Sequence, residues 1–344
     1  MANKGSRTGF KRLFARRGMG QVITVFFGLV ALSLVFYLIN RNFLSQRNIA
    51  NLLRQIAPYL IVGIGQGYVL ITGNIDLSIG SVIGMSTMIS ATLMTKGMDP
   101  WLASAITIIP CLATGYLNGF LVAVCKLPPF IGTLGTMTIA RGVAQLVNGN
   151  MNTDAIGPAA EGWRSVMYYG RTLGIFNTFW IALLIWLAFN YLLSRTRTGR
   201  HVYAIGSNVE AAKLSGVNVP LATIKAYLIS AFCAGVVGLI TCAQAGMGAM
   251  DAGVGYEMYA VAASVIGGIS TLGGQGILLG TVMGASVWGA MYNGLSLIGA
   301  PVAWRNIVVG IIVVLSVLAD VLVRGGAMNR ARLKAALSRK NRNA

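Results

Sequence analysis

The sequence predicts an all-α polytopic membrane protein with about ten transmembrane helices. Hydrophobic residues make up 56% of the 344 residues and charged residues only 10%, a balance that excludes a soluble enzyme. Apolar runs of membrane-spanning length recur along the chain. The 27 Lys and Arg residues gather mainly in the two tails and one central segment. They do not form a patch interleaved with aromatic residues, so no nucleic-acid partner is expected.

Short polar segments separate the candidate spans. A span needs about 20 mainly apolar residues, and this criterion selects residues 21–40, 55–72, 79–95, 101–125, 131–148, 176–194, 223–246, 257–270, 277–298 and 304–323. The eighth is short and rich in glycine, so it is expected to be re-entrant or broken inside the protein, which leaves eight to ten spans open. Basic tails at 1–20 and 324–344 flank this transmembrane domain of residues 21–323.

The basic residues predict the orientation of the chain. With ten spans, 19 of the 27 Lys and Arg residues fall on one side, in the two tails, at Lys126 and between residues 195 and 225. The positive-inside rule therefore places both termini in the cytoplasm. The first apolar run leads to Arg41 without a small-residue cleavage site, so it is expected to be a retained span and not a signal peptide.

The central polar segment, residues 195–222, is too long for a simple turn. Ser207 and Glu210 have capping-box spacing, and the residues from Ala211 to Leu214 favour helix. Gly216 is placed to supply a left-handed C-terminal cap. The segment predicts a two-turn helix at the membrane surface, suited to contact with a soluble partner.

One carboxylate, Asp76, lies between the second and third spans. A carboxylate near the membrane is costly to bury and is a functional candidate by default. Two interpretations stay open. Asp76 or Ser78 caps the helix that starts near Ile79, or Asp76 relays a proton or cation. Capping is favoured because no second acid lies at a matching relay position.

Four further acids are expected on the outer side of the membrane. Asp154 and Glu161 lie in the longest external loop, whereas Asp251 and Glu257 flank residues 253–256 after the seventh span. They contact an extracytoplasmic partner or substrate, or they are solvated loop charges.

The chain lacks the residue patterns of an ATPase and of an intramembrane serine protease. Residues 273–276 are glycine-rich but lack the Lys-Ser/Thr pair of a phosphate loop, so no ATP hydrolysis by this chain is expected. His201 is the sole histidine and lies away from any membrane serine, which excludes an intramembrane Ser-His pair. The four cysteines lie singly in apolar segments, so neither a metal site nor a bound cofactor is predicted.

Five motifs together resemble the permease subunits of bacterial ribose, galactose and xylose ABC importers, within the branched-chain amino acid and sugar permease family. The motifs are residues 72–81 (TGNIDLSIGS), 130–136 (FIGTLGT), 198–216 (TGRHVYAIGSNVEAAKLSG), 255–263 (GYEMYAVAA) and 267–274 (GGISTLGG). The chain departs from the family pattern at Asn74, where glycine is usual, and at Tyr259, where aspartate is usual.

The resemblance implies a permease subunit of an ATP-driven importer that carries a monosaccharide or related polyol across the bacterial inner membrane. It implies a fold like that of the cobalamin importer's permease and a homodimer with the path between the two copies. The implied partners are two cytoplasmic ATPase subunits, which use ATP and Mg²⁺, and a periplasmic sugar-binding protein, with membrane lipid around the spans.

The resemblance and the sequence together assign three sets of residues. The residues expected to couple to the ATPase are Gly199, Arg200, Gly206, Ser207, Asn208, Glu210, Ala211, Ala212, Ser215 and Gly216. Those expected to line or gate the path are Gln66, Asn74, Asp76, Ser78, Asn118, Thr133, Thr136 and Asn293. Those expected to contact the binding protein are Asp154, Glu161, Asp251 and Glu257.

A rival interpretation is an ion-coupled secondary transporter or channel that works without ATPases. In that case Asp76 would be the coupling-ion site. The capped cytoplasmic helix argues against it, because such a transporter needs no docking element for a soluble ATPase.

Overall fold

The structure is a computed structural model that describes residues 19–304, together with 307–308, 310–311, 314–315 and 318. Within these residues the chain is mostly helical and its only strands are two of two residues each, which confirms the predicted all-α class. The two basic tails and most of the predicted span 304–323 lie outside the described residues.

The longer helices follow the first nine predicted spans in order, apart from α9, which lies in the central polar segment. They are α2 (Met19–Ile39), α3 (Gln46–Ile71), α4 (Ile79–Thr95), α5 (Pro100–Ala123), α6 (Pro129–Leu146), α8 (Asn177–Arg195), α9 (Arg197–Ser207), α11 (Val219–Ala245), α12 (Tyr256–Ile266) and α13 (Leu278–Leu297). The shorter elements are η1 (Arg41–Leu44), η2 (Pro158–Ala160), α7 (Glu161–Arg164), η3 (Ser165–Tyr169), α10 (Val209–Leu214) and the antiparallel strands β1 (Arg171–Thr172) and β2 (Ile175–Phe176).

Four of the described helices, α2, α5, α8 and α11, are long and apolar enough to cross a membrane by length and composition. The helices α4 and α12 are apolar but shorter. The predicted range 79–95 coincides with α4 at both ends, and the short eighth segment appears as the 11-residue helix α12.

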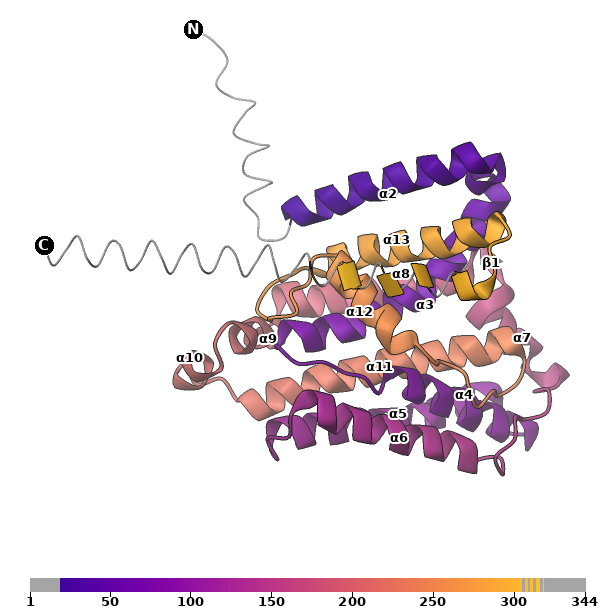
Figure 1. Cartoon of the computed structure of the whole chain (residues 1–344). Coiled ribbons are helices and arrows are strands. Elements are labelled where there is room, and N and C mark those ends of the chain that lie inside the picture. The colour runs from indigo at the N-terminus through magenta and orange to yellow at the C-terminus, as the bar shows by residue number, and fades with distance from the viewer. Residues whose placement is uncertain (1–18, 305–306, 309, 312–313, 316–317, 319–344) are drawn as a thin grey trace, which may run out of the picture.

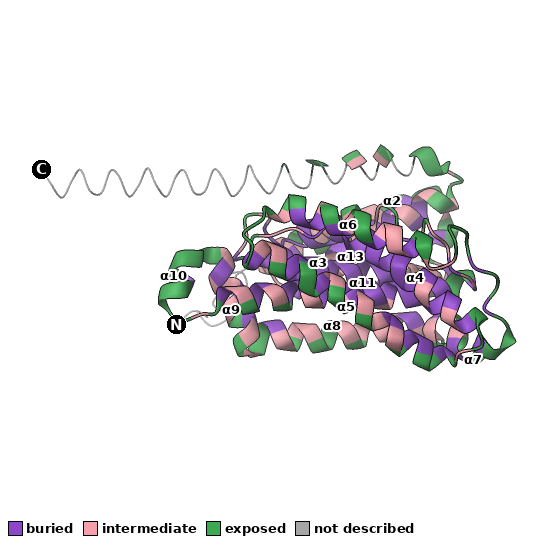
Figure 2. Ribbon diagram, turned by 90° about the horizontal axis from the view of Figure 1, so that it is seen from below, coloured by how far each residue is buried: buried purple, intermediate pink, exposed green. Residues whose placement is uncertain are grey.

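The long helices lie side by side, and the connecting elements gather at two opposite ends of the molecule (Figure 1). We call these the α9–α10 end and the α7 end, because α9 and α10 lie at one and α7 with β1 at the other. Buried residues concentrate along α3, α4 and α11 in the middle of the molecule (Figure 2). The described part of the chain therefore has α3 and α11 at its centre.

Glycines on α3 allow its neighbours to approach its backbone. A Cβ at Gly65 would lie only 2.8 Å from the Cα of Ser230 on α11, and one at Gly63 would lie 2.8 Å from the Thr281 methyl group on α13. Small residues at such positions permit close helix packing in membrane proteins. The repeated glycines of this segment are thus explained by packing.

The helix α3 also contacts the elements at the α7 end. The Arg54 guanidinium carbon lies 4.0 Å from the ring centroid of Phe176 on β2 and 4.8 Å from that of Tyr168 on η3. Cation–π contacts of this length hold the β1–β2 hairpin against the first half of α3. At its other end, α3 ends at Ile71, beside α9. The Gly274 N–H donates to the Ile71 carbonyl (2.8 Å), and the turn that contains Gly274 also contacts Gly206 of α9.

The segment between α3 and α4, residues 72–78, turns back into the bundle, and we call it the re-entrant segment. The Tyr227 hydroxyl donates to the Ile75 carbonyl (3.0 Å), and the Ser230 hydroxyl donates to Asp76 (2.7 Å). Ser230 lies eleven residues beyond Val219, the first residue of α11, which is about 17 Å along the helix axis at 1.5 Å per residue. Helix α4 therefore begins inside the bundle and not at its end.

A second segment, residues 246–255, enters the bundle from the α7 end. Gly253, at φ 78°, packs against Gly80 and Ile83 of α4, and Gly255, at φ 83°, precedes α12. Both glycines occupy left-handed backbone conformations that other residues rarely adopt. As a result α4 and α12 both begin within the bundle, and α12 leads to the α9–α10 end.

Candidate functional site

A buried polar network surrounds Asp76, which is 1% exposed. One carboxylate oxygen, Oδ1, accepts hydrogen bonds from the Ser78 backbone N–H (2.9 Å) and the Ser78 hydroxyl (2.6 Å). The other, Oδ2, accepts from the Ser230 hydroxyl (2.7 Å). Buried carboxylates are stabilised by such donors.

The network extends to α5 and α6 through an amide. The Asn118 Nδ2 donates to the Ser78 hydroxyl (2.9 Å) and, at 3.4 Å, to Asp76. The Thr136 hydroxyl donates to the Asn118 Oδ1 (2.5 Å). Four residues expected to line or gate the path thus lie together, joining the re-entrant segment to α5, α6 and α11.

The capping prediction for this segment needs correction. The Ser78 side chain makes no cap bond to α4, and Asp76 accepts from the Ser78 N–H just before the helix begins. The Ser78 hydroxyl is instead committed to the Asp76 carboxylate. Asp76 therefore organises the start of α4.

The other residues predicted for the path lie apart from this network. Thr133 donates within its own helix to Pro129 (2.8 Å), and Asn293 exchanges hydrogen bonds with Asn48 near the start of α3 (2.9 and 3.2 Å). Asn74 donates to the Thr72 hydroxyl (2.8 Å). The Gln66 amide is fully buried on α3 and has no hydrogen-bond partner among the described residues.

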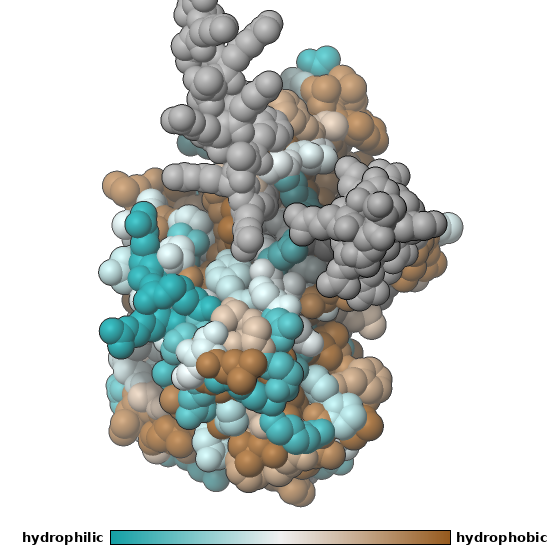
Figure 3. All heavy atoms as spheres, turned by 90° about the vertical axis from the view of Figure 1, so that its left-hand side faces the viewer, coloured by the Kyte–Doolittle hydropathy of each residue, from teal (hydrophilic) through white to brown (hydrophobic). Residues whose placement is uncertain are grey.

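The predicted coupling segment forms two helices, α9 and α10, at one end of the molecule. Gly199, Val202 and Ile205 of α9 are buried, whereas Arg200 is exposed. Hydrophilic residues cover much of this end, and hydrophobic residues lie around and among them (Figure 3). Helix α9 thus packs against the bundle through one face, and its other face carries exposed polar residues, Arg200 among them.

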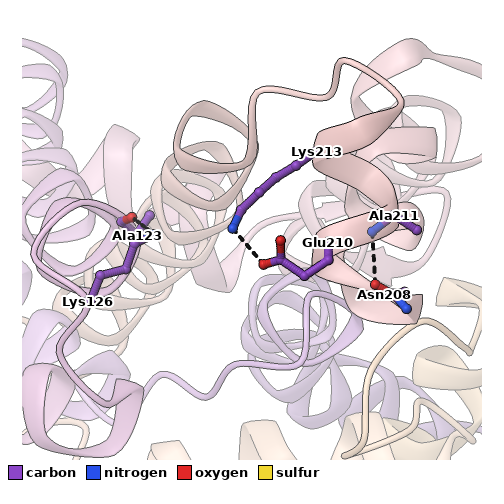
Figure 4. Close-up of polar contacts among 6 residues, drawn as sticks. All are labelled: Ala123, Lys126, Asn208, Glu210, Ala211 and Lys213. Carbon is purple, nitrogen blue, oxygen red and sulfur yellow. Dashed lines mark hydrogen bonds and ion pairs between the residues drawn. The ribbon is translucent and has the colours of Figure 1, made fainter.

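The N-cap of α10 lies one residue later than predicted. The Asn208 Oδ1 accepts from the Ala211 N–H (2.9 Å), so Asn208 and not Ser207 is the N-cap (Figure 4). Ser207 is instead the last residue of α9. Gly216 follows α10 with φ 79°, as predicted for a left-handed cap residue.

The outer surface of α10 is different from the one expected. Ala212, predicted to face a soluble partner, is only 4% exposed and packs with Ile205, Val219 and Ala222 of its own chain. That prediction is wrong because this six-residue helix turns its Ala212 side towards α11. Leu214 is 90% exposed. A 2.7 Å ion pair joins Lys213 to Glu210 on the surface (Figure 4), and Ser215 donates to the Ala211 carbonyl (2.8 Å).

Backbone contacts join α9 to the bundle. A Cβ at Gly206 would overlap the Ile71 carbonyl oxygen and the Gly274 nitrogen, so only glycine fits there. Nearby, the Tyr203 hydroxyl donates to the Gly276 carbonyl (2.6 Å). Burial raises the pKa of Tyr203 to about 12, which keeps this hydroxyl protonated as a donor at neutral pH.

A cavity of about 390 Å³ lies beside this junction. It is lined by the start of the re-entrant segment, the end of α5 and the α9–α10 turn, including Asn74, Lys126, Gly206, Asn208 and Thr223.

The acids expected on the outer side divide into two groups. Asp154, Glu161 and Asp251 are exposed, and Glu161 lies 3.8 Å from Arg164 on α7. Glu257 instead packs against Gly80 at the start of α4, inside the bundle. The described residues contain no group of three or more His, Cys, Asp or Glu side chains that could hold a metal ion.

Three residues of this region escaped the sequence analysis. Ser230 and Tyr227 donate hydrogen bonds to the re-entrant segment, but in the sequence both are ordinary residues of an apolar span. Arg141 of α6 donates to three backbone carbonyls inside the bundle. An arginine within a predicted span was the available signal, because ionisable residues in such positions usually have partners.

Comparison with known proteins identifies the family. The family described as "Branched-chain amino acid transport system / permease component" matches residues 48–317. The ribose import permease protein RbsC of Escherichia coli (strain K12) is 34% identical over 295 residues, which cover 85% of this chain and 91% of the relative. No solved structure matches the chain.

Two further relatives from the same strain give the same result. The D-allose transport system permease protein AlsC is 32% identical, over 82% of this chain and 85% of its own. The galactose/methyl galactoside import permease protein MglC is 33% identical, over 86% and 92%. The chain is a membrane protein that belongs to the branched-chain amino acid transport system permease family.

Proposed function

We propose that this chain is the permease subunit of an ATP-driven importer that carries a monosaccharide or related polyol across the bacterial inner membrane. Its relatives are named permeases for ribose, allose and galactose and match over most of its length. The observation that carries the proposal is the exposed α10, mounted on the bundle by close backbone contacts at Gly206. This arrangement suits a subunit driven by a soluble partner.

The proposed assembly has two copies of this chain with the path between them, two cytoplasmic ATPase subunits and a periplasmic sugar-binding protein. The ATPases would dock at the α9–α10 end, and the binding protein at the α7 end, where Asp154 and Glu161 are exposed. ATP and Mg²⁺ belong to the ATPases, and this chain binds no cofactor of its own. The proposed fold has about ten spans and resembles the cobalamin-importer permease.

The proposed orientation places both termini and the α9–α10 end in the cytoplasm. It follows from the basic residues at this end, Arg195, Arg197, Arg200 and Lys213 among them. Reporter fusions are expected to show Gly206 in the cytoplasm and Asp154 outside. A periplasmic signal from a fusion at Gly206 would overturn the orientation.

Movement of the ATPases would reach the path through α9. Closure of the ATPases displaces α10 and α9, and the contacts of Gly206 with Ile71 and Gly274 carry the displacement to the ends of α3 and the 267–277 loop. Ile71 directly precedes the re-entrant segment that holds Asp76. Because packed interfaces switch between discrete arrangements, this shift opens or closes the path around the Asp76 network.

Gly206→Ala tests this connection. The added Cβ would overlap the Ile71 carbonyl and force α9 away from α3. In proteoliposomes that contain the full importer, sugar transported per ATP hydrolysed is expected to fall about tenfold or more. Gly142→Ala on α6 is the matched control, because no atom lies within 4 Å of that Cβ. Wild-type coupling in Gly206→Ala would contradict the mechanism.

Reconstitution tests the function as a whole. The chain with its ATPases and binding protein is expected to accumulate ribose, allose or galactose against a gradient when ATP and Mg²⁺ are present. The chain alone is expected to accumulate none. If the complete assembly moved none of these sugars or related polyols, the proposal would fail.

The buried carboxylate of Asp76 is the observation that favours the rival function, an ion-coupled transporter or channel. A buried acid is the usual site for a coupling proton or cation. The same carboxylate is, however, already bonded by Ser78 and Ser230. Uphill uptake by the lone chain, driven by a proton or sodium gradient, would establish the rival.

A further inference from the structure

Two ionisable side chains converge on Gly80, apart from the Asp76 network. Arg141 of α6 donates from Nη1 to the carbonyls of Met250 (2.6 Å) and Ala252 (3.0 Å), and from Nη2 to that of Gly80 (3.3 Å). The Glu257 carboxylate of α12 packs on Gly80 so closely that a Cβ there would overlap its Oε2. The two side chains meet where α4 and α12 both begin.

This meeting point lies inside the bundle, yet it is open on one side. Arg141 and Glu257 are each partly exposed, and their neighbours Val254 and Met258 are 66% and 54% exposed. Charged side chains at such depth avoid lipid and face protein or a water-filled space. This side of α12 therefore borders something other than lipid.

The acid and the base do not pair directly. The ion pairs within 4.0 Å among the described residues are Arg164–Glu161 and Lys213–Glu210 only. A guanidinium has five N–H donors, and three of them go to the backbone carbonyls named above. Arg141 thus keeps donors, and the Glu257 carboxylate keeps acceptor capacity, for a ligand between them.

We propose that Arg141 and Glu257 form a hydroxyl-binding site on the translocation path, in which neighbouring hydroxyls of the sugar bridge the carboxylate and the guanidinium. One hydroxyl donates to the Glu257 carboxylate, and the next accepts from an Arg141 N–H. The inference rests on the proposed function and makes both residues determinants of specificity.

The chemistry of the pair selects a neutral polyol. A carboxylate beside a guanidinium carries no net charge, so a free anion or a free cation is attracted by one of the two side chains and repelled by the other. An apolar ligand would leave both groups desolvated and without hydrogen-bond partners. Sites that bind hydroxyl groups therefore discriminate strongly against ligands that lack them. Adjacent hydroxyls supply the donor and the acceptor that the two side chains require.

Cysteine labelling tests whether the site is wet and occupied by sugar. Met258→Cys is placed in a Cys125→Ser background, which removes the exposed native thiol. In the complete importer, a charged thiol reagent is expected to modify Met258→Cys, and the imported sugar is expected to slow the reaction. Leu184→Cys on α8, at a 66% exposed apolar position, is the lipid-facing control and is expected not to react.

Two labelling outcomes overturn the inference. Failure of Met258→Cys to react would mean that lipid or a second copy covers this side of α12. Reaction at a rate independent of the sugar would mean that no sugar binds beside Glu257.

Glu257→Gln tests the contribution of the carboxylate. Glutamine preserves the packing on Gly80 but removes the charge that strengthens the hydrogen bond to a hydroxyl. Sugar transported per ATP hydrolysed is expected to fall about tenfold, with normal membrane levels and normal retention of the ATPases. Asp99→Asn, at an exposed carboxylate that caps α5, is the matched control and is expected to transport normally, because asparagine can also accept from the Trp101 and Leu102 N–H groups.

The outcomes separate this inference from the proposed function. Normal transport by Glu257→Gln, in an importer whose wild type carries sugar, overturns the site and leaves the function intact. Loss of ATPase retention in Glu257→Gln also overturns it, since Glu257 would then act in folding. Failure of the wild-type importer to carry any sugar removes the proposed function itself.

Discussion

Asp76→Ala is expected to abolish import and to destabilise the protein by about 3 kcal/mol or more. The substitution removes the acceptor of the Ser78 N–H, the Ser78 hydroxyl and the Ser230 hydroxyl, all of which are buried. Each buried donor left without a partner costs about 1 to 3 kcal/mol. Thermal unfolding of the purified chain in detergent measures the stability, and uptake by the complete importer measures transport.

Asp76→Asn separates the shape of the side chain from its charge. The amide oxygen still accepts from the N–H and hydroxyl of Ser78, so the expected loss of stability is smaller than for Asp76→Ala. If the carboxylate only organises the start of α4, Asp76→Asn retains ATP-driven import. Wild-type stability in Asp76→Ala would show that the hydrogen-bond network does not hold the re-entrant segment.

Leu214→Glu is expected to reduce retention of the ATPases by more than about tenfold. Leu214 is 90% exposed at the end of α10 and offers the largest apolar side chain on this helix. A leucine that fills a pocket of the partner is replaced by a charge that the pocket cannot solvate. Co-purification of tagged ATPase with the chain, and import, are the two measurements.

The matched control is Leu173→Glu. Leu173 is 87% exposed but lies at the α7 end, between β1 and β2. It is expected to leave the ATPases bound. Equal losses in both variants would indicate a general effect of the added charge, and normal retention in Leu214→Glu would mean that the ATPases do not dock on this surface of α10.

Hydropathy predicted the helices well because apolar length is a local property of the sequence. The range 79–95 matches α4, and the glycine-rich eighth segment is a short helix as expected. The depth at which α4 begins was beyond prediction. It depends on bonds from Ser230 and Tyr227, which lie more than 150 residues away in the chain.

The central segment shows the limit of local signals. Ser207 and Asn208 are adjacent and both are good N-cap residues. Asn208 is the N-cap of α10 because α9, packed against the bundle, extends as far as Ser207. The inward orientation of Ala212 likewise depends on Val219 and Ala222 across the turn, and no pattern within a six-residue helix reveals it.

The candidate site was predicted in part. Asp76, Ser78, Asn118 and Thr136 were selected as polar residues near or within spans, and the fold brings them into one network. Asn293 was selected by the same criterion and lies elsewhere, bonded to Asn48. Polarity within a span thus indicates that a residue has a partner, whereas the identity of the partner is a property of the tertiary structure.

The position of α3 has a thermodynamic consequence for the proposed assembly. This continuous helix contacts the β1–β2 hairpin through Arg54 and the α9 junction through Ile71. If occupancy at one end alters α3, linkage requires the effect to be reciprocal. If the ATP-bound ATPases change the affinity of the chain for the binding protein by some factor, the docked binding protein must change the affinity of the ATPases for the α9–α10 end by the same factor.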